Sequence, residues 1–151
     1  MNLSKYITES EFVLSQTAVR LGIDNTMNDQ QRADAVDLCT HFIDAVQDYY
    51  KKPVSVTSGY RCEKLNEYIG GSRTSNHCLG NAMDFTVKDI PLKSLFNDIA
   101  SGKIKFIKPF DELIFEFDSW VHLARRDFPR KKILRAYKIG GSTVYKDVLS
   151  V

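Results

Sequence analysis

The stretch TSGYRCEKLNEYIGGSRTSNHCLGNAMDF, residues 57–85, holds the succession of elements that decides the fold. It begins at the end of a β-branched run, VSVTS (54–58), which predicts a strand after the helix-breaking Pro53. The segment CEKLNEYI (62–69) has the apolar spacing of a short helix, and the two glycines after it favour a stop. AMDFTV (82–87) alternates apolar and polar residues and predicts a second strand.

Two polar side chains of this stretch are candidate metal ligands, together with a histidine further along the chain. His77 falls in a segment of turn composition, and Asp84 falls on the strand face that points away from the core. In WVHLA (120–124), the same alternation puts His122 on an open strand face. Two imidazoles and one carboxylate are the protein ligands of many catalytic zinc sites. Spacing alone does not single out this triple, because a chain with three histidines and 19 acidic residues supplies such triples by chance.

A zinc hydrolase also needs a carboxylate that is not a ligand and that takes a proton from the attacking water. Glu116 is the main candidate, because a charge is unusual between two phenylalanines of a hydrophobic strand. If the following turn is formed by residues 118–120, Glu116 lies directly across from His122. A two-residue turn would pair Phe115 with His122 instead, and Asp118 is therefore the reserve candidate. A solvated position on an edge strand is the alternative for Glu116.

The remaining segments complete an α+β pattern. Apolar residues three and four apart predict a long helix at about 29–51, and Pro91 begins another that stops at Gly102. ELIFEF (112–117) and WVHLA predict two strands joined by a tight turn, and a hairpin around two adjacent glycines follows near the C-terminus. We therefore expect helices packed on one face of a small, mostly antiparallel sheet, with an extra C-terminal hairpin.

The length of 151 residues and the composition, 43% hydrophobic and 26% charged, fit one globular domain. We expect its core at about 8–125 and a basic hairpin extension at 126–151. No run approaches the roughly 18 apolar residues that cross a bilayer, and no signal peptide is recognised, so we expect synthesis in the cytoplasm without membrane insertion. A target outside the cell would then require release or delivery. The three cysteines lack CxxC spacing and are expected to be free thiols.

Basic residues gather near the C-terminus, although the formal net charge is only +2. One alternative is a solvated basic face, and the other is attraction to an anionic polymer. The overall charge is too small to indicate nucleic acid as a partner. The residues of this basic stretch are Arg125, Arg126, Arg130, Lys131, Lys132, Arg135 and Lys138.

The segments SGYRCEKLNEYIGGSRTSNHCLGNAMDF (58–85) and FDELIFEFDSWVHLA (110–124) together resemble the zinc D-alanyl-D-alanine carboxypeptidases and the related phage endolysin peptidases. Those proteins show an SGYR segment, a histidine with an aspartate seven residues later, and a W-V-H or W-H strand. The resemblance runs from about Leu14 to Arg125, and its motifs are specific in combination. It implies the Hedgehog/DD-peptidase fold, and beyond Phe128 it implies nothing.

The resemblance also implies roles for residues of this chain. His77, Asp84 and His122 would bind one zinc ion. Arg61 of SGYR would hold the terminal carboxylate of the substrate, with Ser75 as a second pocket residue. A structural salt bridge is the alternative for Arg61.

One position departs from the pattern of many relatives, which place the catalytic acid three residues before the last histidine. This chain has Ser119 there. The acid/base would then be Glu116 or Asp118, and the strand form LIFEF, typical of a phage-type branch, favours Glu116.

The activity implied is hydrolysis of peptidoglycan stem peptides at D-alanine by a monomeric zinc peptidase. Loops at the far side of the cleft would decide between a carboxypeptidase and an endopeptidase. The basic stretch would attract an anionic cell wall, and a phage or prophage product would be delivered to it. The departure at Ser119 leaves an alternative, a non-catalytic module that keeps zinc for stability or for binding the cell wall.

Overall fold

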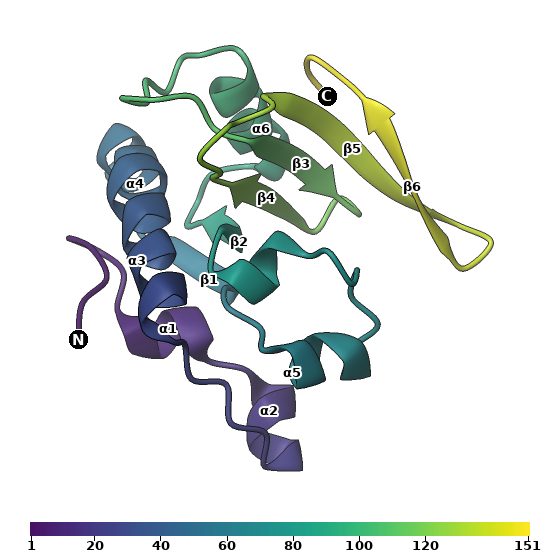
Figure 1. Ribbon diagram of the computed structural model, residues 1–151. Helices are drawn as coiled ribbons and strands as arrows, with labels where there is room; N and C mark the ends of the chain where they lie inside the picture. Colours follow the sequence, from purple (N-terminus) through teal and green to yellow (C-terminus); the bar gives the residue numbers. More distant parts are fainter.

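The computed structural model describes residues 1–151, and its central feature is a six-stranded sheet (Figure 1). The strand order is β1-β2-β4-β3-β5-β6, and each neighbouring pair is antiparallel except β3 with β5. The predicted α+β class is confirmed. The strands are β1 (Val54–Ser58), β2 (Ala82–Val87), β3 (Glu112–Glu116), β4 (Trp120–Ala124), β5 (Lys132–Ile139) and β6 (Ser142–Asp147).

Most of the helical structure precedes the second strand. The first helix begins at a capping box, in which Thr8 and Glu11 each accept the backbone N–H of the other. No helix is long and apolar enough to span a membrane. The helices are α1 (Glu9–Val13), α2 (Gln16–Leu21), α3 (Asp29–Leu38), η1 (Cys39–Ile43), α4 (Asp44–Tyr50), α5 (Glu63–Tyr68), η2 (Asn76–Leu79) and α6 (Leu92–Ala100).

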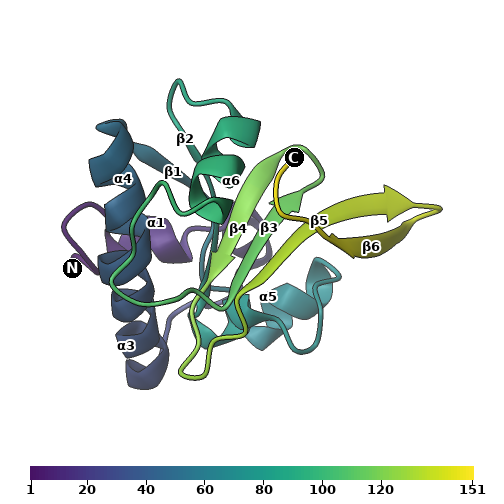
Figure 2. The same cartoon turned by 90° about the horizontal axis from the view of Figure 1, so that it is seen from above.

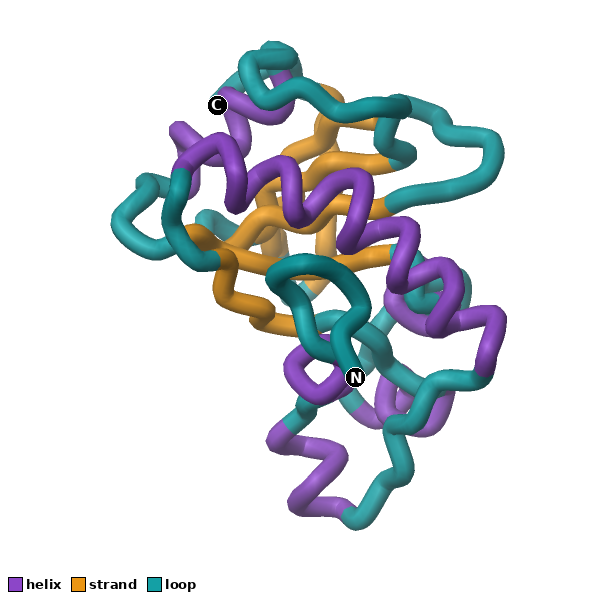
Figure 3. The backbone as a smooth tube through the Cα atoms, turned by 90° about the vertical axis from the view of Figure 1, so that its left-hand side faces the viewer, coloured by secondary structure: helices purple, strands orange, loops and turns teal.

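The long helix expected at about 29–51 is present as the continuous run α3, η1 and α4, which crosses the sheet in Figure 3. Its middle segment, η1, is a wide π-helical turn. Leu38 before this turn, Phe42 within it and Val46 after it are all buried. The helix therefore keeps one apolar side against the sheet along its length.

The hydrophobic core lies between this long helix, α1, α6 and one face of the sheet. Phe42 and Phe96 on the helices and Phe85, Phe115 and Leu123 on the strands belong to one cluster of 23 buried residues. The segment with α5 and η2 lies across the strands from α3 and α4 (Figure 2). The sheet face opposite the core carries polar side chains of β2, β3 and β4, and the functional site lies there.

The predicted C-terminal hairpin is confirmed as β5 and β6, which are joined at Gly140 and Gly141. Both glycines have positive φ, as a tight hairpin turn requires. The sequence did not indicate that β5 pairs in parallel with β3. Through this pairing the hairpin extends the central sheet rather than standing beside it. All three cysteines are free, as predicted.

Several arginines of the basic stretch form ion pairs, whereas its three lysines are exposed and form none. Arg125 is buried and contacts Asp37, with Nε 2.7 Å from Oδ2. Arg130 donates from Nε and from a terminal nitrogen to the two oxygens of the fully buried Asp111, at 3.0 and 2.8 Å. These pairs hold the connection between β4 and β5 in place.

Candidate metal centre

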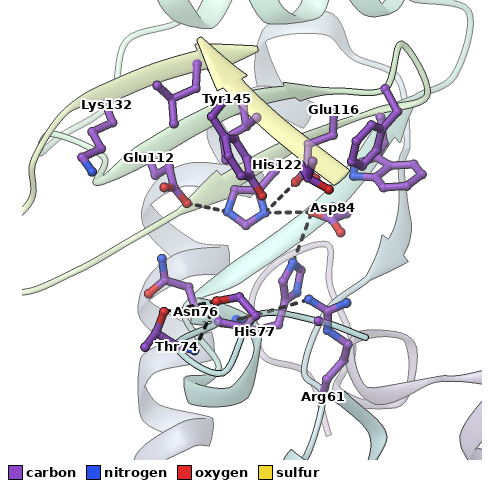
Figure 4. Close-up of a pocket in the computed structure, with 18 of the residues that line it drawn as sticks. Arg61, Thr74, Asn76, His77, Asp84, Glu112, Glu116, His122, Lys132 and Tyr145 are labelled. Atoms are coloured by element: carbon purple, nitrogen blue, oxygen red, sulfur yellow. Dashed lines mark hydrogen bonds and ion pairs between the residues drawn. The ribbon is translucent and has the colours of Figure 1, made fainter. Parts of the chain in front are cut away.

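His77, Asp84 and His122 lie together on the polar side of the sheet (Figure 4). Their ligand atoms all lie within 4.8 Å of one another. Oδ1 of Asp84 is 3.2 Å from Nε2 of His77 and 2.9 Å from Nδ1 of His122. Asp84 and His122 are direct partners on β2 and β4, and His77 approaches from η2. The structure thus brings together the three residues that the sequence suggested as ligands.

The orientation of His77 is fixed by the SGYR segment. Its Nδ1 lies 2.7 Å from the carbonyl oxygen of Gly59, so this nitrogen carries the proton and Nε2 faces Asp84. Gly59 passes close to the N-terminal helix, and a Cβ there would lie 2.2 Å from the carbonyl oxygen of Phe12. Glycine at this position therefore allows the chain to present the carbonyl group that orients His77.

Glu112 is a site residue that the sequence analysis did not identify. Its Oε1 lies 3.0 Å from Nε2 of His122, on the opposite side of the ring from Asp84. This contact orients the imidazole and leaves Nδ1 as the nitrogen that faces the other ligands. The available signal was the alternation in ELIFE, which places Glu112 on the same strand face as Glu116.

Glu116 also lies next to His122, although neither of the two registers considered from the sequence is formed. Glu116 pairs with Trp120, and Ile114 pairs with His122. The turn is formed by residues 117–119, one position earlier than expected. Glu116 is consequently a diagonal neighbour of His122 on the same face, with Oε1 3.3 Å from Nδ1.

The two acidic candidates differ in environment. Burial and the neighbouring Asp84 carboxylate raise the pKa of Glu116 to about 7, in the range that suits a general base near neutral pH. Asp118 is exposed and its Oδ1 lies 2.6 Å from Arg135. It does not line the cleft that contains the ligand triple.

The charge states around the triple are set by mutual contacts in the metal-free protein. Burial favours the neutral form of Asp84, but contacts with His77 and His122 outweigh it and keep the pKa of Asp84 below its usual range. Burial would lower the pKa of His122, but hydrogen bonds to Asp84 and Glu112 raise it to about 10. The triple therefore contains an ionised carboxylate, that of Asp84. To bind a cation, Nε2 of His77 and Nδ1 of His122 would have to carry no proton.

Arg61 lies at the edge of the same cleft, close to Ser75. One terminal nitrogen donates to Oγ of Ser75 at 3.3 Å, and the buried Nε has no hydrogen-bond partner. No carboxylate forms an ion pair with Arg61, so the structural salt bridge considered for it is absent. Asn25 fixes the turn around Arg61, because its side chain bonds the carbonyl of Tyr60 at 2.9 Å and the N–H of Cys62 at 2.8 Å.

The ligand triple lines a cleft of about 800 Å³, together with Glu112, Glu116, Arg61 and Ser75. One wall is formed by residues 69–77 with Arg61, and the floor is formed by the polar face of β2, β3 and β4. Two histidine nitrogens and a carboxylate oxygen open toward this space, and both rings are held by outer contacts. The residues present therefore fit a zinc ion with three protein ligands and one open side.

Comparison with known proteins identifies the family. The family model described as Peptidase M15 matches residues 5–124. This chain belongs to the peptidase M15 family. M15 peptidases are zinc-dependent metallopeptidases, in agreement with the donor set of the triple. No curated protein matches the chain.

The M15 match includes all the site residues described above and ends at Ala124. The hairpin β5–β6 lies outside it, but its side chains still reach the cleft. Lys132, Leu134 and Lys138 on β5 and Tyr145 on β6 are among the lining residues. The wall of the cleft opposite residues 69–77 is thus built by a segment that the family model does not cover.

Proposed function

We propose that this M15 peptidase hydrolyses peptidoglycan stem peptides at D-alanine, as an endolysin-like enzyme that uses one zinc ion. The observation that carries the proposal is the buried triple of His77, Asp84 and His122, with Glu116 3.3 Å from His122, in an open cleft. This arrangement has the parts of a zinc hydrolase: three protein ligands, an open side and a non-ligand carboxylate.

His77, Asp84 and His122 would hold the ion, which when bound would polarise the scissile carbonyl and activate water. Glu116 accepts a proton from the attacking water and passes it to the leaving amine, a role open to a carboxylate that is not a ligand and lies 3.3 Å from His122. Arg61 binds the carboxylate at the end of the substrate. Its planar guanidinium has no carboxylate partner within the protein and is suited to bidentate contacts.

Ser75 has a supporting part in this scheme. Its Oγ accepts from Arg61 and also from the backbone N–H of His77 at 3.2 Å. It therefore links the residue that would bind the substrate to one that would bind the metal. For an enzyme made in the cytoplasm, we propose that the cell wall is reached after release or delivery, as for a phage or prophage product.

The test is digestion of purified muropeptides by the zinc-loaded protein, with products identified by mass. We expect release of D-alanine or cleavage of cross-links, and no cleavage after chelation. Intact muropeptides together with bound zinc would instead support the non-catalytic module. Loss of the terminal residue alone would indicate a carboxypeptidase, and separated cross-linked peptides would indicate an endopeptidase.

A further inference from the structure

Strand β5 of the hairpin β5–β6 lies beside β3, the strand that carries Glu112 and Glu116. Within the sheet, Glu112 pairs with Lys132, and Glu116 pairs with Ala136. Ala136 in turn pairs with Tyr145 of β6. The hairpin side chains that face the cleft are therefore immediate neighbours of the two glutamates that contact His122.

The cleft carries more positive than negative side chains. Its lining carboxylates are Asp84, Glu112 and Glu116, and a bound metal ion would add further positive charge. A cleft lined in this way attracts anionic groups. The lining cations are Arg61, Arg126, Arg130, Lys132 and Lys138.

The cations lie at different ends of the cleft. Figure 4 places Lys132 and Arg61 on opposite sides of the ligand triple. Arg61 donates to Ser75 beside η2, whereas Arg130 lies 3.8 Å from Glu112, on the side of Lys132. The end marked by Glu112 therefore has positive charges that are separate from Arg61.

At the Glu112 end, two of the three cations, Arg126 and Lys132, have only long contacts or no ion pair. Arg130 is bound by Asp111 through two oxygens. Lys132 is exposed and makes no ion pair, and Arg126 is exposed with its nearest carboxylate, Asp111, 3.8 Å away. Arg126 also reaches Oδ1 of Asn76 on the opposite wall at 3.5 Å. These two side chains can thus turn to a ligand without breaking a strong contact.

We propose that Arg126 and Lys132 form a second carboxylate-binding subsite, on the side of the metal centre opposite Arg61. This inference rests on the proposed function, in which Arg61 holds the carboxylate on the leaving side. The second subsite then binds an acidic group on the acyl side of the scissile bond. The substrate is accordingly a stem peptide with a free carboxylate before the D-alanine residues. Charge-assisted hydrogen bonds to that carboxylate would stabilise the complex.

The test compares two synthetic stem peptides that end in D-alanyl-D-alanine. They differ only in the residue before this dipeptide, which carries a side-chain carboxylate in one and a carboxamide in the other. The zinc-loaded wild-type protein is expected to prefer the carboxylate peptide by about tenfold in kcat/KM, as for the loss of one charge-assisted contact. The double variant R126Q/K132Q is expected to lose this preference through KM.

Lys146→Gln is the matched control, because Lys146 is an exposed lysine of the same hairpin that does not line the cleft. It is expected to keep the wild-type preference. Equal rates for the two peptides with wild-type protein, or a preference that survives in R126Q/K132Q, would overturn the subsite while leaving the peptidase activity established. If wild-type protein cleaves neither peptide nor muropeptides, the proposed function itself fails, and the subsite with it.

Discussion

The carboxylate of Glu116 lies 3.3 Å from Nδ1 of His122, although the two residues are not partners across their strands. They are diagonal neighbours on β3 and β4, on the face of the sheet that opens to the cleft. This relationship places a largely buried acid with a raised pKa beside the proposed metal ligands without making it a member of the triple.

Glu116→Gln tests the acid/base role, because glutamine keeps the size of the side chain but cannot accept the proton. We expect kcat to fall by about 10²- to 10⁴-fold, the usual contribution of a general acid/base. The zinc content, measured by atomic emission, should remain at the wild-type level.

Asp118→Asn is the control for that variant. Asp118 is exposed and paired with Arg135, outside the cleft. Removing its charge should leave kcat within about twofold and stability within about 0.5 kcal/mol of wild type. Activity that survives in Glu116→Gln and disappears in Asp118→Asn would reverse the assignment.

Glu112→Ala is expected to weaken zinc binding about 10- to 100-fold, because the outer contact that orients His122 is lost. Competition with a chromogenic chelator would measure this affinity. Glu112→Gln retains an oxygen that can accept from Nε2 of His122 and should restore most of the affinity. Equal affinity in wild type and Glu112→Ala would show that this contact does not position the ligand.

Asp111→Asn is expected to destabilise the protein by about 2–3 kcal/mol, because the Arg130 guanidinium loses a charged partner at a buried position. Burial would raise the pKa of Asp111, but the hydrogen bonds from Arg130 outweigh it and hold the pKa below its ordinary value. The folded-state pKa is thus lower than the unfolded one. The pair therefore stabilises the fold above about pH 4 and loses this contribution as the pH falls through the folded-state value.

Urea unfolding of wild type and Asp111→Asn at several pH values between 7 and 3 would check this. The difference in unfolding free energy between wild type and Asp111→Asn should narrow as the pH falls toward the folded-state pKa of Asp111. A gap that is constant over this range would mean that the charge of Asp111 contributes nothing to stability.

Metal removal should abolish activity and leave the fold in place. The core cluster packs on the opposite face of the sheet and contains none of His77, Asp84 and His122. We therefore expect chelated protein to keep its far-UV circular dichroism spectrum while its Tm falls, because zinc stabilises the state that binds it. Addition of zinc should restore both Tm and activity. A chelated protein with the spectrum of an unfolded chain would show that the metal is required for folding.

The sequence was sufficient for the strands and for the strand face of two of the three ligands, and the family resemblance was needed to select the full triple. Strict alternation in AMDFTV and WVHLA put Asp84 and His122 on one face, and the structure pairs them directly. Alternation alone could not predict which residues form the turn between β3 and β4, and hence the register of these strands. Phe117 and Asp118 both have positive φ, a conformation that sequence signals assign to glycine or asparagine. Tertiary contacts, including the N–H of Phe117 on the carbonyl of Ala136 at 3.1 Å, hold this turn.

Local sequence patterns likewise could not predict that the C-terminal hairpin pairs with β3. A hairpin is encoded by alternation and a glycine turn, but its partner strand is chosen by contacts between distant residues. The ion pair between the buried Asp111 and the exposed Arg130 supports this choice, since Arg130 follows β4 and Asp111 precedes β3. The role of Glu112 was missed although alternation puts it on the face of Glu116, because its contact with His122 depends on the register of β3 and β4.

The most direct test of the account is the mass analysis of muropeptide products from zinc-loaded wild type and Glu116→Gln, with metal content measured in the same samples. Wild type alone is expected to cleave at D-alanine, with equal zinc in both proteins. Uncut muropeptides with zinc-loaded wild type, or equal cleavage by both proteins, would contradict it.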